Sequence, residues 1–451
     1  MTRSLRRWYT LLLAATLASA GVVVALPQPA LAATTANAGT VFYWNDTLLE
    51  AFRRQGGGPG PLARAAAIMN GALFDVLNSA QWGRQSYVGG GYRGAFTLAE
   101  TYSAVDDNLA AGIAARDALI DALPLQRDYI EQRYTQRHGT AVQAEATSLA
   151  AAVVAAERQN RANDGANATP SYTLDNVPGS WRPTGGACAT PVDPHWGLVK
   201  PFVMTSTTQS RQPLPGGYTT YPTLLASSRY ADVVNEVKSL GKSNSTTRTA
   251  DQTQAAFYWA NDANGTYKPP GQLLAHTRVV AEPRITNPIT LSRLFAQVSF
   301  AMADAAIAAW DHKYFTSIDL WRPVTAIQLA DTDGNAATVQ DPSWQPLGAT
   351  PCFPAWVSGH ATLAAAWAGV MRTAFGDSIT YTAGTDDPNA AGVTRTFTSF
   401  TQAATEDARS RVYLGVHYQF DADDGMASGT SVASLATAKM GVLKCIDPCI
   451  P

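Results

Sequence analysis

Cysteine is scarce in this sequence: four of the 451 residues are cysteines, and none of them forms a C-x-x-C pair. A metal site built from these thiols is therefore disfavoured, because structural zinc sites use closely spaced cysteine pairs. Strict alternation of apolar and polar residues, which is typical of half-buried strands, extends over no useful length. The sequence therefore predicts neither a thiolate metal centre nor a large β-sheet.

Long apolar runs are also missing after residue 32, where no segment has eighteen uninterrupted apolar residues. The first 32 residues are different, because three arginines precede an apolar stretch at residues 11–26. This order, followed by Ala30-Leu31-Ala32, is typical of a secretory signal peptide that is cleaved near Ala32. A membrane anchor is the alternative interpretation. We expect the remaining chain to be secreted and to have no membrane contact.

Because disulfides form in oxidising compartments, a secreted protein is expected to have its cysteines paired. Four cysteines suggest two disulfides, for which three pairings are possible. Of these we favour Cys188–Cys352 together with Cys445–Cys449.

The chain without its first 32 residues has a small excess of negative charge. Those 32 residues contain three of the 33 basic residues and none of the 35 acidic ones, which leaves 30 basic residues and a net charge of −5. Proteins that bind polyanions through charge usually carry a basic excess or a basic stripe. The composition therefore argues against a nucleic-acid partner.

Apolar positions at helical spacing predict an all-α fold. In the N-terminal part the predicted helices cover residues 41–52, 62–79, 97–122, 125–138 and 141–164. Later helices are predicted at residues 227–240, 247–258, 292–310, 359–375, 396–413 and 424–443. We expect helical bundles with long irregular loops, divided into an N-terminal part (33–225) and a C-terminal part (226–451).

Residues 167 to about 222 form a central loop that is rich in Pro, Gly and Thr. We expect this loop to be packed rather than flexible, because it contains Trp181, Trp196 and Phe202. The stretch from Asp331 to Asn335 resembles a fragment of a calcium-binding loop. Its glycine comes too early and no bidentate glutamate follows, so a turn is predicted there.

Three short blocks in the C-terminal part carry the chemistry. They are Lys313 with Trp321-Arg322-Pro323, then Ser358-Gly359-His360, then Ser410-Arg411 with His417 and Asp421. Ser, Gly and His at a helix start offer backbone N–H groups, the positive helix end and an imidazole to one oxyanion. Three cations, of which two are arginines suited to bidentate contacts, predict a multiply charged anion.

In order and spacing, these blocks resemble the signature of the vanadium-dependent haloperoxidases and the type 2 phosphatidic acid phosphatases. There are 33 residues between Pro323 and Val357 and 49 between His360 and Ser410, and the family permits both intervals. The chloroperoxidases of this family are built from two packed four-helix-type bundles, which the two helix-rich parts of this chain can accommodate.

Two features depart from the family pattern. Val357 stands where the family usually has proline, and eight residues separate Lys313 from Arg322 where the family usually has six. Residues seven apart on one helix face nearly the same way, whereas residues nine apart point in opposite directions. Either two additional residues near Thr316 and Ser317 lie in a turn, or Lys313 is not the counterpart. Trp310 favours the turn, because the chloroperoxidases place a tryptophan three residues before their lysine.

The resemblance implies a role for each residue of the blocks. His417 would bind the vanadium of vanadate or attack phosphorus, and Asp421 would keep the reactive nitrogen of His417 unprotonated. His360 would be the acid–base group. The oxygens of the anion would be held by Lys313, Arg322, Ser358, Gly359 and Arg411.

Phe353 and Trp310 are candidates for the halide site. The resemblance implies this role for Phe353, because chloroperoxidases commonly have an aromatic residue five positions before the serine. A phenyl ring there would shield vanadate from water and favour the oxidation of chloride. The alternative is that Phe353 belongs to the ordinary core.

Three functions remain open at this point. The first is a secreted vanadium-dependent haloperoxidase that needs vanadate and uses hydrogen peroxide, halide and a small organic acceptor. The second is a soluble acid phosphatase that cleaves a phosphate ester through a phosphohistidine intermediate, and the third is a non-catalytic anion-binding protein. A serine-hydrolase role for Ser358 is disfavoured, because the G-x-S-x-G turn and its strand are absent. The sequence indicates neither the halide nor the oligomeric state.

Overall fold

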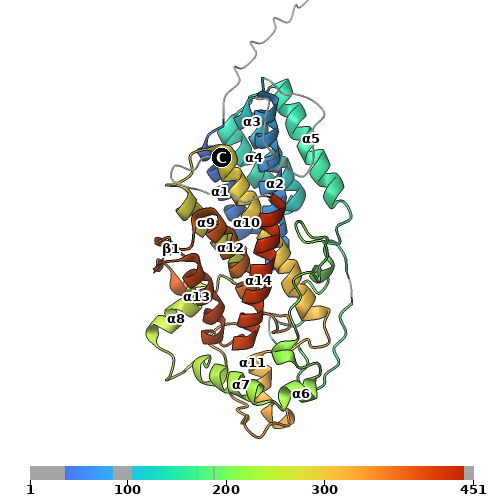
Figure 1. Cartoon of the computed structure of the whole chain (residues 1–451), viewed down its shortest axis with the longest axis vertical. Helices are drawn as coiled ribbons and strands as arrows, with labels where there is room; N and C mark the ends of the chain where they lie inside the picture. Colours follow the sequence, from blue (N-terminus) through green and yellow to red (C-terminus); the bar gives the residue numbers. More distant parts are fainter. Residues whose placement is uncertain (1–35, 85–103, 170, 186–187, 441–451) are drawn as a thin grey trace, which may run out of the picture. The chain divides into compact units, whose positions relative to one another are not determined.

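The computed structural model of this protein consists almost entirely of helices and loops. It describes residues 36–84, 104–169, 171–185 and 188–440. Within these ranges there are fourteen α-helices, and the only sheet is the antiparallel hairpin of β1 (Tyr381–Gly384) and β2 (Thr394–Phe397) (Figure 1). The all-α prediction is therefore confirmed. None of the described helices is both long enough and apolar enough to cross a bilayer.

The N-terminal part contains five α-helices that pack against one another. They are α1 (Ala38–Gln55), α2 (Pro59–Arg84), α3 (Asp107–Ala122), α4 (Arg127–His138) and α5 (Ala144–Arg161), with the 3-10 helix η1 (Pro124–Gln126) before α4. α2 packs against α3 and α5, and α3 packs against α4. The helix predicted from residue 97 begins only at Asp107, because Asp106 caps it by accepting the Leu109 N–H at 3.0 Å. Residues 97–103 lie outside the described ranges.

The rest of the described chain contains nine α-helices. They are α6 (Tyr221–Leu225), α7 (Ser228–Leu240), α8 (Ala250–Tyr258), α9 (Lys268–Ala281), α10 (Pro288–Tyr314), α11 (Pro323–Gln328), α12 (Gly359–Phe375), α13 (Phe400–Tyr413) and α14 (Gln419–Met440). The 3-10 helices η2 (Trp196–Leu198), η3 (Pro215–Gly217), η4 (Ala330–Thr332) and η5 (Pro388–Ala390) lie in the connections.

Several of these elements differ from the prediction, and the short helices α6 and α11 are not in it. The prediction omits α9, whose first turn contains Pro269 and Pro270. Proline is tolerated there, because the first N–H groups of a helix have no helical partner. The helix predicted from residue 396 is wrong at its start, because Thr394–Phe397 pairs with β1. α13 begins only after Ser399, whose hydroxyl oxygen accepts the Gln402 N–H at 3.0 Å.

α10 connects the two parts of the chain, because it packs on helices from both. It contacts α2 in the N-terminal part and α12 and α14 in the C-terminal part (Figure 1). Nearly every residue of α10 between Thr290 and Lys313 is buried, as expected for a helix in the centre of a core. The described residues belong to one compact unit. The division near residue 225 stays a prediction.

α12 and α14 lie side by side and run in the same direction, and two glycines of α14 allow their close approach (Figure 1). A Cβ atom at Gly425 would lie 2.8 Å from the Ser358 carbonyl oxygen, and one at Gly429 would lie 2.2 Å from that of Thr362. Larger side chains would therefore force the helices apart. The packing brings the N-termini of both helices together, so that their positive dipole ends meet.

The central loop is packed, as the sequence predicts. Trp181 and Trp196 are buried and Phe202 is half-buried. The predicted disulfide Cys188–Cys352 is present, with a Cα–Cα distance of 4.9 Å, and it joins the loop to the residues before α12. Cys445 and Cys449 lie outside the described ranges. Residues 331–335 form the predicted turn, in which Gly334 has a φ of 72°.

Candidate anion-binding site

The site begins at the N-terminus of α12. Ser358 is the N-cap residue, and its hydroxyl oxygen accepts the Ala361 N–H at 3.4 Å. The N–H of Ser358 donates to the carbonyl oxygen of Asp421 at 2.9 Å. The N–H groups of Gly359 and His360 make no hydrogen bond to the described residues. These two N–H groups are therefore the ones at this helix end that remain for an anion.

His417 lies beside this helix end with its ring fixed at both nitrogens. Nδ1 is 2.9 Å from Asp421 Oδ2, and Nε2 is 3.0 Å from Arg322 Nη1. Because a guanidinium can only donate, Nε2 is the acceptor and Nδ1 carries the proton. Burial, and then the charges of Arg322, Lys313 and Arg411, lower the pKa of His417 well below its ordinary value. His417 is therefore a neutral imidazole with its Nε2 lone pair among cations.

Asp421 fixes this arrangement from the first turn of α14. Its Oδ2 also accepts the Tyr418 N–H at 3.1 Å, so that two donors meet at one oxygen. Burial raises the pKa of the Asp421 carboxyl to about 7, while the Tyr418 N–H and the charges of Lys313 and Arg322 act in the opposite direction. The two donors keep Oδ2 an acceptor, which holds the proton of His417 on Nδ1.

Arg322 and Arg411 are fully buried and only partly satisfied. Arg322 Nε donates to the Phe353 carbonyl oxygen at 2.7 Å, and Nη1 donates to that of Val416 at 2.7 Å. Arg411 Nη2 donates to Asp262 Oδ2 at 2.8 Å. Arg322 Nη2, Arg411 Nε and Arg411 Nη1 have no hydrogen-bond partner among the described residues.

Three unpaired guanidinium nitrogens at one site fit a multiply charged oxyanion. A buried donor without an acceptor costs about 1–3 kcal/mol, and more when it is charged. An oxyanion such as vanadate or phosphate would supply acceptors to Arg322 and Arg411 and to the N–H groups at the start of α12. The neutral Nε2 of His417 is close enough to Arg322 to face the same anion. The donor set therefore fits the group that the sequence predicts.

Lys313 contacts the segment before Ser358, although eight residues separate it from Arg322 where the family usually has six. α10 ends at Tyr314, so Thr316 and Ser317 lie in the turn between Lys313 and Arg322. The buried ammonium of Lys313 donates to the carbonyl oxygens of Pro354, Ala355 and Val357 at 2.7, 3.1 and 2.5 Å. All three N–H groups are thus bonded to the main chain, and Lys313 can act on an anion through its charge.

Lys313→Met is expected to affect folding more than anion binding. The apolar side chain would leave three carbonyl oxygens without a donor, and we expect the free energy of unfolding to fall by about 2–4 kcal/mol. The affinity for the anion should fall less than about tenfold, or 1.4 kcal/mol, because only a charge contribution is lost. Denaturant unfolding and vanadate calorimetry measure the two effects. A loss of affinity as large as that of Arg411→Ala would show that Lys313 binds the anion directly.

His360 is held by a carbonyl group of the segment after α8. Its Nε2 is 3.1 Å from the Ala260 carbonyl oxygen, so Nε2 carries the proton and Nδ1 is the basic nitrogen. Burial, and then the charge of Arg411, lower the pKa of His360 to about 4. His360 is therefore neutral at neutral pH, as a proton acceptor must be.

Anion binding is expected to be accompanied by proton uptake at His360. A negative charge beside the ring offsets the charge of Arg411 and raises the pKa of His360 from about 4. Between that value and its higher value in the complex, the complex binds more protons than the free protein, so affinity rises as the pH falls. Calorimetry at pH 5.5 in buffers of different ionisation enthalpy should show an uptake approaching one proton. The same uptake in His360→Ala would assign it to another group.

Two acidic residues of the site are missing from the sequence prediction. Asp262 follows α8 and pairs with Arg411, and its side chain is 42% exposed. Burial alone would raise its pKa, but the charges of Arg411 and His360 lower the pKa of Asp262 overall. Asp262 is 149 residues from Arg411 in the sequence, and no motif points to the pair.

Asp407 is the second acidic residue that the prediction omits. It is 2% exposed, it lies one turn before Arg411 on α13, and its Oδ1 has no partner among the described residues. Burial raises the pKa of Asp407 well above its ordinary value, although the charge of Arg411 lowers it. In the sequence, only the position of Asp407 one helical turn before Arg411 could have indicated that the two side chains are neighbours.

Phe353 and Trp310 form an aromatic wall beside the cations. Their ring centroids are 4.9 Å apart. The Phe353 ring lies 4.9 Å from Lys313 Nζ and 4.8 Å from Arg322 Cζ. A Cβ atom at Gly359 would lie 3.5 Å from the Trp310 ring. The structure therefore places both halide-site candidates against the anion-binding residues.

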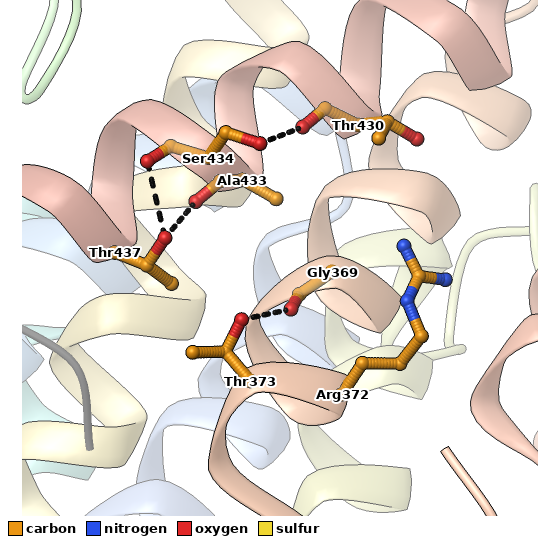
Figure 2. Close-up of a pocket in the computed structure, with 7 residues that line it drawn as sticks. All are labelled: Gly369, Arg372, Thr373, Thr430, Ala433, Ser434 and Thr437. Atoms are coloured by element: carbon orange, nitrogen blue, oxygen red, sulfur yellow. Dashed lines mark hydrogen bonds between the residues drawn. The ribbon is translucent and has the colours of Figure 1, made fainter. Parts of the chain in front are cut away.

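A surface hollow between α12 and α14 is separate from this site (Figure 2). Its volume is about 230 Å³, and it is lined by Gly369, Arg372, Thr373, Thr430, Ala433, Ser434 and Thr437. Gly369 lies ten residues after Gly359, which corresponds to about 15 Å along a helix. Arg372 Nη1 donates to the Thr401 hydroxyl at 3.1 Å. The hollow contains none of the predicted site residues.

The fold and the candidate site define a class of protein: an all-α bundle in which two neutral histidines, two partly satisfied arginines and two helix N-termini form a buried site suited to an oxyanion. Residues 293–443 match the family described as the VCPO second helical-bundle domain. These residues include all the predicted site residues. The chain belongs to the superfamily of vanadium-dependent haloperoxidases and type 2 phosphatidic acid phosphatases.

Individual relatives agree with this placement. The chain is 27% identical over 253 residues to the vanadium chloroperoxidase of Curvularia inaequalis, in a match that covers 43% of this chain and 40% of that protein. Its fold is similar to that of a bacterial vanadium-dependent iodoperoxidase, with a TM-score of 0.75, 23% identity and coverage of 90% of this chain and 98% of the other. A bacterial vanadium-dependent chloroperoxidase in its holo form has a TM-score of 0.63 and 17% identity, with coverage of 89% and 91%.

Proposed function

We propose that this protein is a secreted vanadium-dependent haloperoxidase that oxidises halide with hydrogen peroxide to hypohalous acid. The observation that carries the proposal is the set of three buried guanidinium nitrogens that have no partner in the described part of the chain, next to the unprotonated Nε2 of His417. The similarity to chloroperoxidases and an iodoperoxidase supports the same activity. Hydrogen peroxide, halide and a small organic acceptor are the proposed partners.

Vanadate would be held by three kinds of interaction: charge attraction, hydrogen bonds and one nitrogen ligand. Arg322 and Arg411 would donate to its oxygens from their unpaired nitrogens, together with the Gly359 N–H. His417 Nε2, which accepts Arg322 Nη1 in this structure, would exchange that hydrogen bond for vanadium, and Asp421 keeps the nitrogen unprotonated. Bound vanadate would act as a Lewis acid that activates peroxide without changing its own oxidation state.

His360 would act as the general acid–base group of the reaction. In total, hydrogen peroxide, halide and one proton give hypohalous acid and water. His360 Nδ1 is free to accept a proton from hydrogen peroxide, because Nε2 donates to Ala260. The same nitrogen can return the proton when water leaves. The aromatic wall of Phe353 and Trp310 would exclude water beside the cations.

An acid phosphatase acting on a phosphate ester is the second candidate. The observation that favours it is the neutral, carboxylate-backed His417, since a nucleophile that attacks phosphorus needs the same unprotonated nitrogen. The two functions are separated by a paired assay on one preparation. The apoprotein is tested with vanadate, peroxide and halide, and separately with an aryl phosphate. Halogenation without phosphatase activity supports the haloperoxidase, and the reverse result rejects it. Anion binding without either activity leaves the non-catalytic function.

Phe353→His is expected to depress chloride oxidation more than bromide oxidation. The phenyl ring lies over Lys313 and Arg322 and offers halide a poorly solvated position, which matters most for the more strongly hydrated chloride. An imidazole would bring water and a further charge to this position. Steady-state rates with each halide at mildly acidic pH measure the difference. Equal losses for both halides, or a wild type that oxidises only bromide, would reject Phe353 as a selectivity residue.

Secretion is part of the proposal and rests on the first 32 residues, which lie outside the described ranges. Their order of arginines, apolar stretch and Ala30-Leu31-Ala32 is that of a signal peptide. Mass spectrometry of the protein recovered from culture medium should place the new N-terminus near residue 33. Recovery of the intact N-terminus in the membrane fraction would favour the anchor.

A further inference from the structure

We propose that the disulfide Cys188–Cys352 is a positioning element of the anion site, which it sets by fixing the central loop against Arg322, Phe353 and Trp310. The inference rests on the proposed anion-binding function. Its consequence is that the affinity for the anion depends on this bond, beyond any effect of the bond on the stability of the fold.

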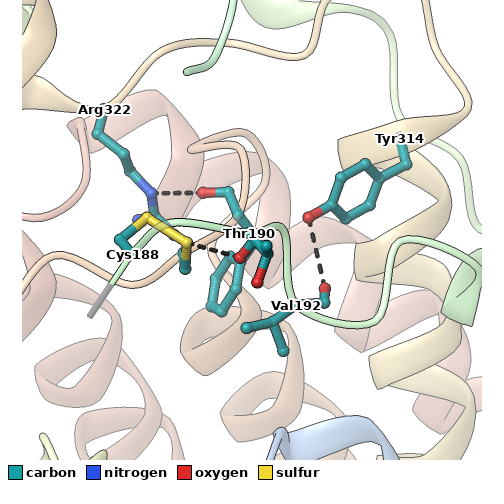
Figure 3. The surroundings of a disulfide bond; sticks show 7 residues. Cys188, Thr190, Val192, Tyr314 and Arg322 are labelled. Carbon is teal, nitrogen blue, oxygen red and sulfur yellow. Dashed lines mark hydrogen bonds between the residues drawn. A yellow bond between two sulfur atoms is a disulfide. The ribbon is translucent and has the colours of Figure 1, made fainter. Parts of the chain in front are cut away.

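One end of the bond is directly adjacent to the site. Cys352 precedes Phe353, whose carbonyl oxygen accepts Arg322 Nε at 2.7 Å (Figure 3). The ring of Phe353 lies over the guanidinium of the same arginine, at 4.8 Å. Arg322 therefore depends on this one residue for a main-chain acceptor and for an aromatic surface. A shift of Cys352 would move both contacts together.

The other end of the bond belongs to a loop that touches the site at two more positions. The N–H of Val192 donates to the Cys352 carbonyl oxygen at 2.9 Å. The carbonyl oxygen of Val192 accepts Trp310 Nε1 at 3.2 Å. It also accepts the Tyr314 hydroxyl at 3.4 Å (Figure 3). The loop thus holds the Trp310 ring, which lies against Gly359 and Phe353.

The same loop is bonded to the residues that precede Arg322. The N–H of Trp181 donates to the Asp319 carbonyl oxygen at 2.7 Å, and the N–H of Trp321 donates to that of Gly179 at 2.8 Å. The side chain of Asp319 accepts the hydroxyl groups of Tyr172 and Tyr221. Residues 172–185 and 188–192 therefore contact the chain immediately before Arg322 as well as the chain immediately before Phe353.

The other polar contacts between the loop and the site are hydrogen bonds, so the disulfide is the one covalent bond that joins the loop to the residue before Phe353. Besides the disulfide, the loop has two polar contacts with the residue before Phe353 among those of the described chain: the Val192 N–H bond and the approach of Cys352 Sγ to the Thr190 carbonyl oxygen at 2.9 Å (Figure 3). Without the sulfur bridge, the loop can separate from Cys352 at the cost of these two contacts. Arg322 and Trp310 then lose their fixed positions while the helices that carry them stay folded.

The test compares anion affinity with stability in the full-length protein. Cys188→Ala removes the bond and leaves every residue of the Ser-Gly-His segment unchanged. Isothermal titration with orthovanadate should give a dissociation constant at least tenfold higher than that of the wild type, measured well below the melting temperature. Because the variant has a free thiol at Cys352, which can reduce vanadate, the titration is repeated with inorganic phosphate.

Two control variants separate positioning from general destabilisation. Leu149→Ala opens a cavity in α5, where Leu149 is fully buried and far from the site in the fold, and should lower the melting temperature without changing the affinity. Cys445→Ala/Cys449→Ala removes the other cysteines and should retain wild-type affinity. If Cys188→Ala folds poorly, wild type that has been reduced, alkylated and freed of reductant is titrated with phosphate instead.

The outcomes of the two proposals are distinguishable. Wild-type protein that binds neither orthovanadate nor phosphate would contradict the proposed function itself. Wild-type protein that binds normally, with an affinity in Cys188→Ala within twofold of that value, would overturn the positioning role. A tenfold loss in Leu149→Ala as well would assign the effect to stability and also overturn it.

Discussion

His417→Ala is expected to abolish vanadate retention and every activity of the site. His417 Nε2 is an unprotonated ring nitrogen that faces the unsatisfied arginines, and Asp421 holds its proton on the opposite nitrogen. We expect no replacement by His360, because its Nε2 is bonded to Ala260 and its Nδ1 is assigned to proton transfer rather than to the ligand role. We expect the dissociation constant for vanadate to rise by more than about a thousandfold, or about 4 kcal/mol. Isothermal titration and the halogenation assay measure the two losses.

The control for this variant is another histidine of the same chain. His195 lies in the central loop, and its Nε2 is 3.0 Å from the Ala166 carbonyl oxygen. His195→Ala should retain vanadate and activity. Asp421→Asn is the informative companion, because it preserves the shape of the side chain but weakens the acceptor for His417 Nδ1 and should give an intermediate loss. Wild-type affinity in His417→Ala would refute the assignment of the ligand nitrogen.

Arg411→Ala is expected to produce the second-largest loss. Arg411 is fully buried, with one nitrogen bonded to Asp262 and two without a partner. Removing it takes away two donors to the anion and leaves Asp262 without its cation, which together should cost about 3–4 kcal/mol of anion binding, or roughly 150- to 900-fold in affinity. Arg411→Lys keeps the charge but not the planar pair of donors, so it should recover only part of the loss. Titration with orthovanadate and with phosphate should show the same order.

Arg409 provides the matched control on the same helix. Its side chain is 26% exposed, and it pairs with Glu236 at the surface rather than with the site. Arg409→Ala should leave the affinity within about twofold of the wild type, since exposed ion pairs contribute little. Similar losses in Arg409→Ala and Arg411→Ala would mean that net charge, rather than directed donors, controls binding.

The sequence predicted the helices whose apolar spacing is regular and missed the elements that depend on distant partners. α12 appears within its predicted bounds because Ser358 is a good N-cap and the residues after it are apolar. α9 was missed because two prolines open it, and β2 was missed because a four-residue strand is stabilised by pairing with β1 rather than by its own pattern. Tertiary contacts decided both.

In the candidate site, too, some features could be predicted from the sequence and others depend on tertiary contacts. The order and spacing of Arg322, Ser358-Gly359-His360, Arg411 and His417 pointed to an oxyanion without any structure, because they resemble the family signature and because cations beside a helix start suit an anion. The pairing of Cys188 with Cys352 was also anticipated and is present. By contrast, Asp262 and the use of all three Lys313 N–H groups by main-chain carbonyls could not be predicted.

The sequence by itself therefore determined the fold class and predicted the kind of ligand and the side chains offered to it. Only the tertiary structure decided which donors are free, because each hydrogen bond that a cation makes to a carbonyl group or a carboxylate depends on atoms far away in the chain. Lys313 is satisfied by the segment before Ser358, whereas Arg411 keeps two nitrogens unpaired although it binds Asp262. The type of a cationic residue and its spacing in the sequence are the same whether or not its donors are already bonded. Only the folded structure therefore distinguishes a satisfied cation from one with free donors.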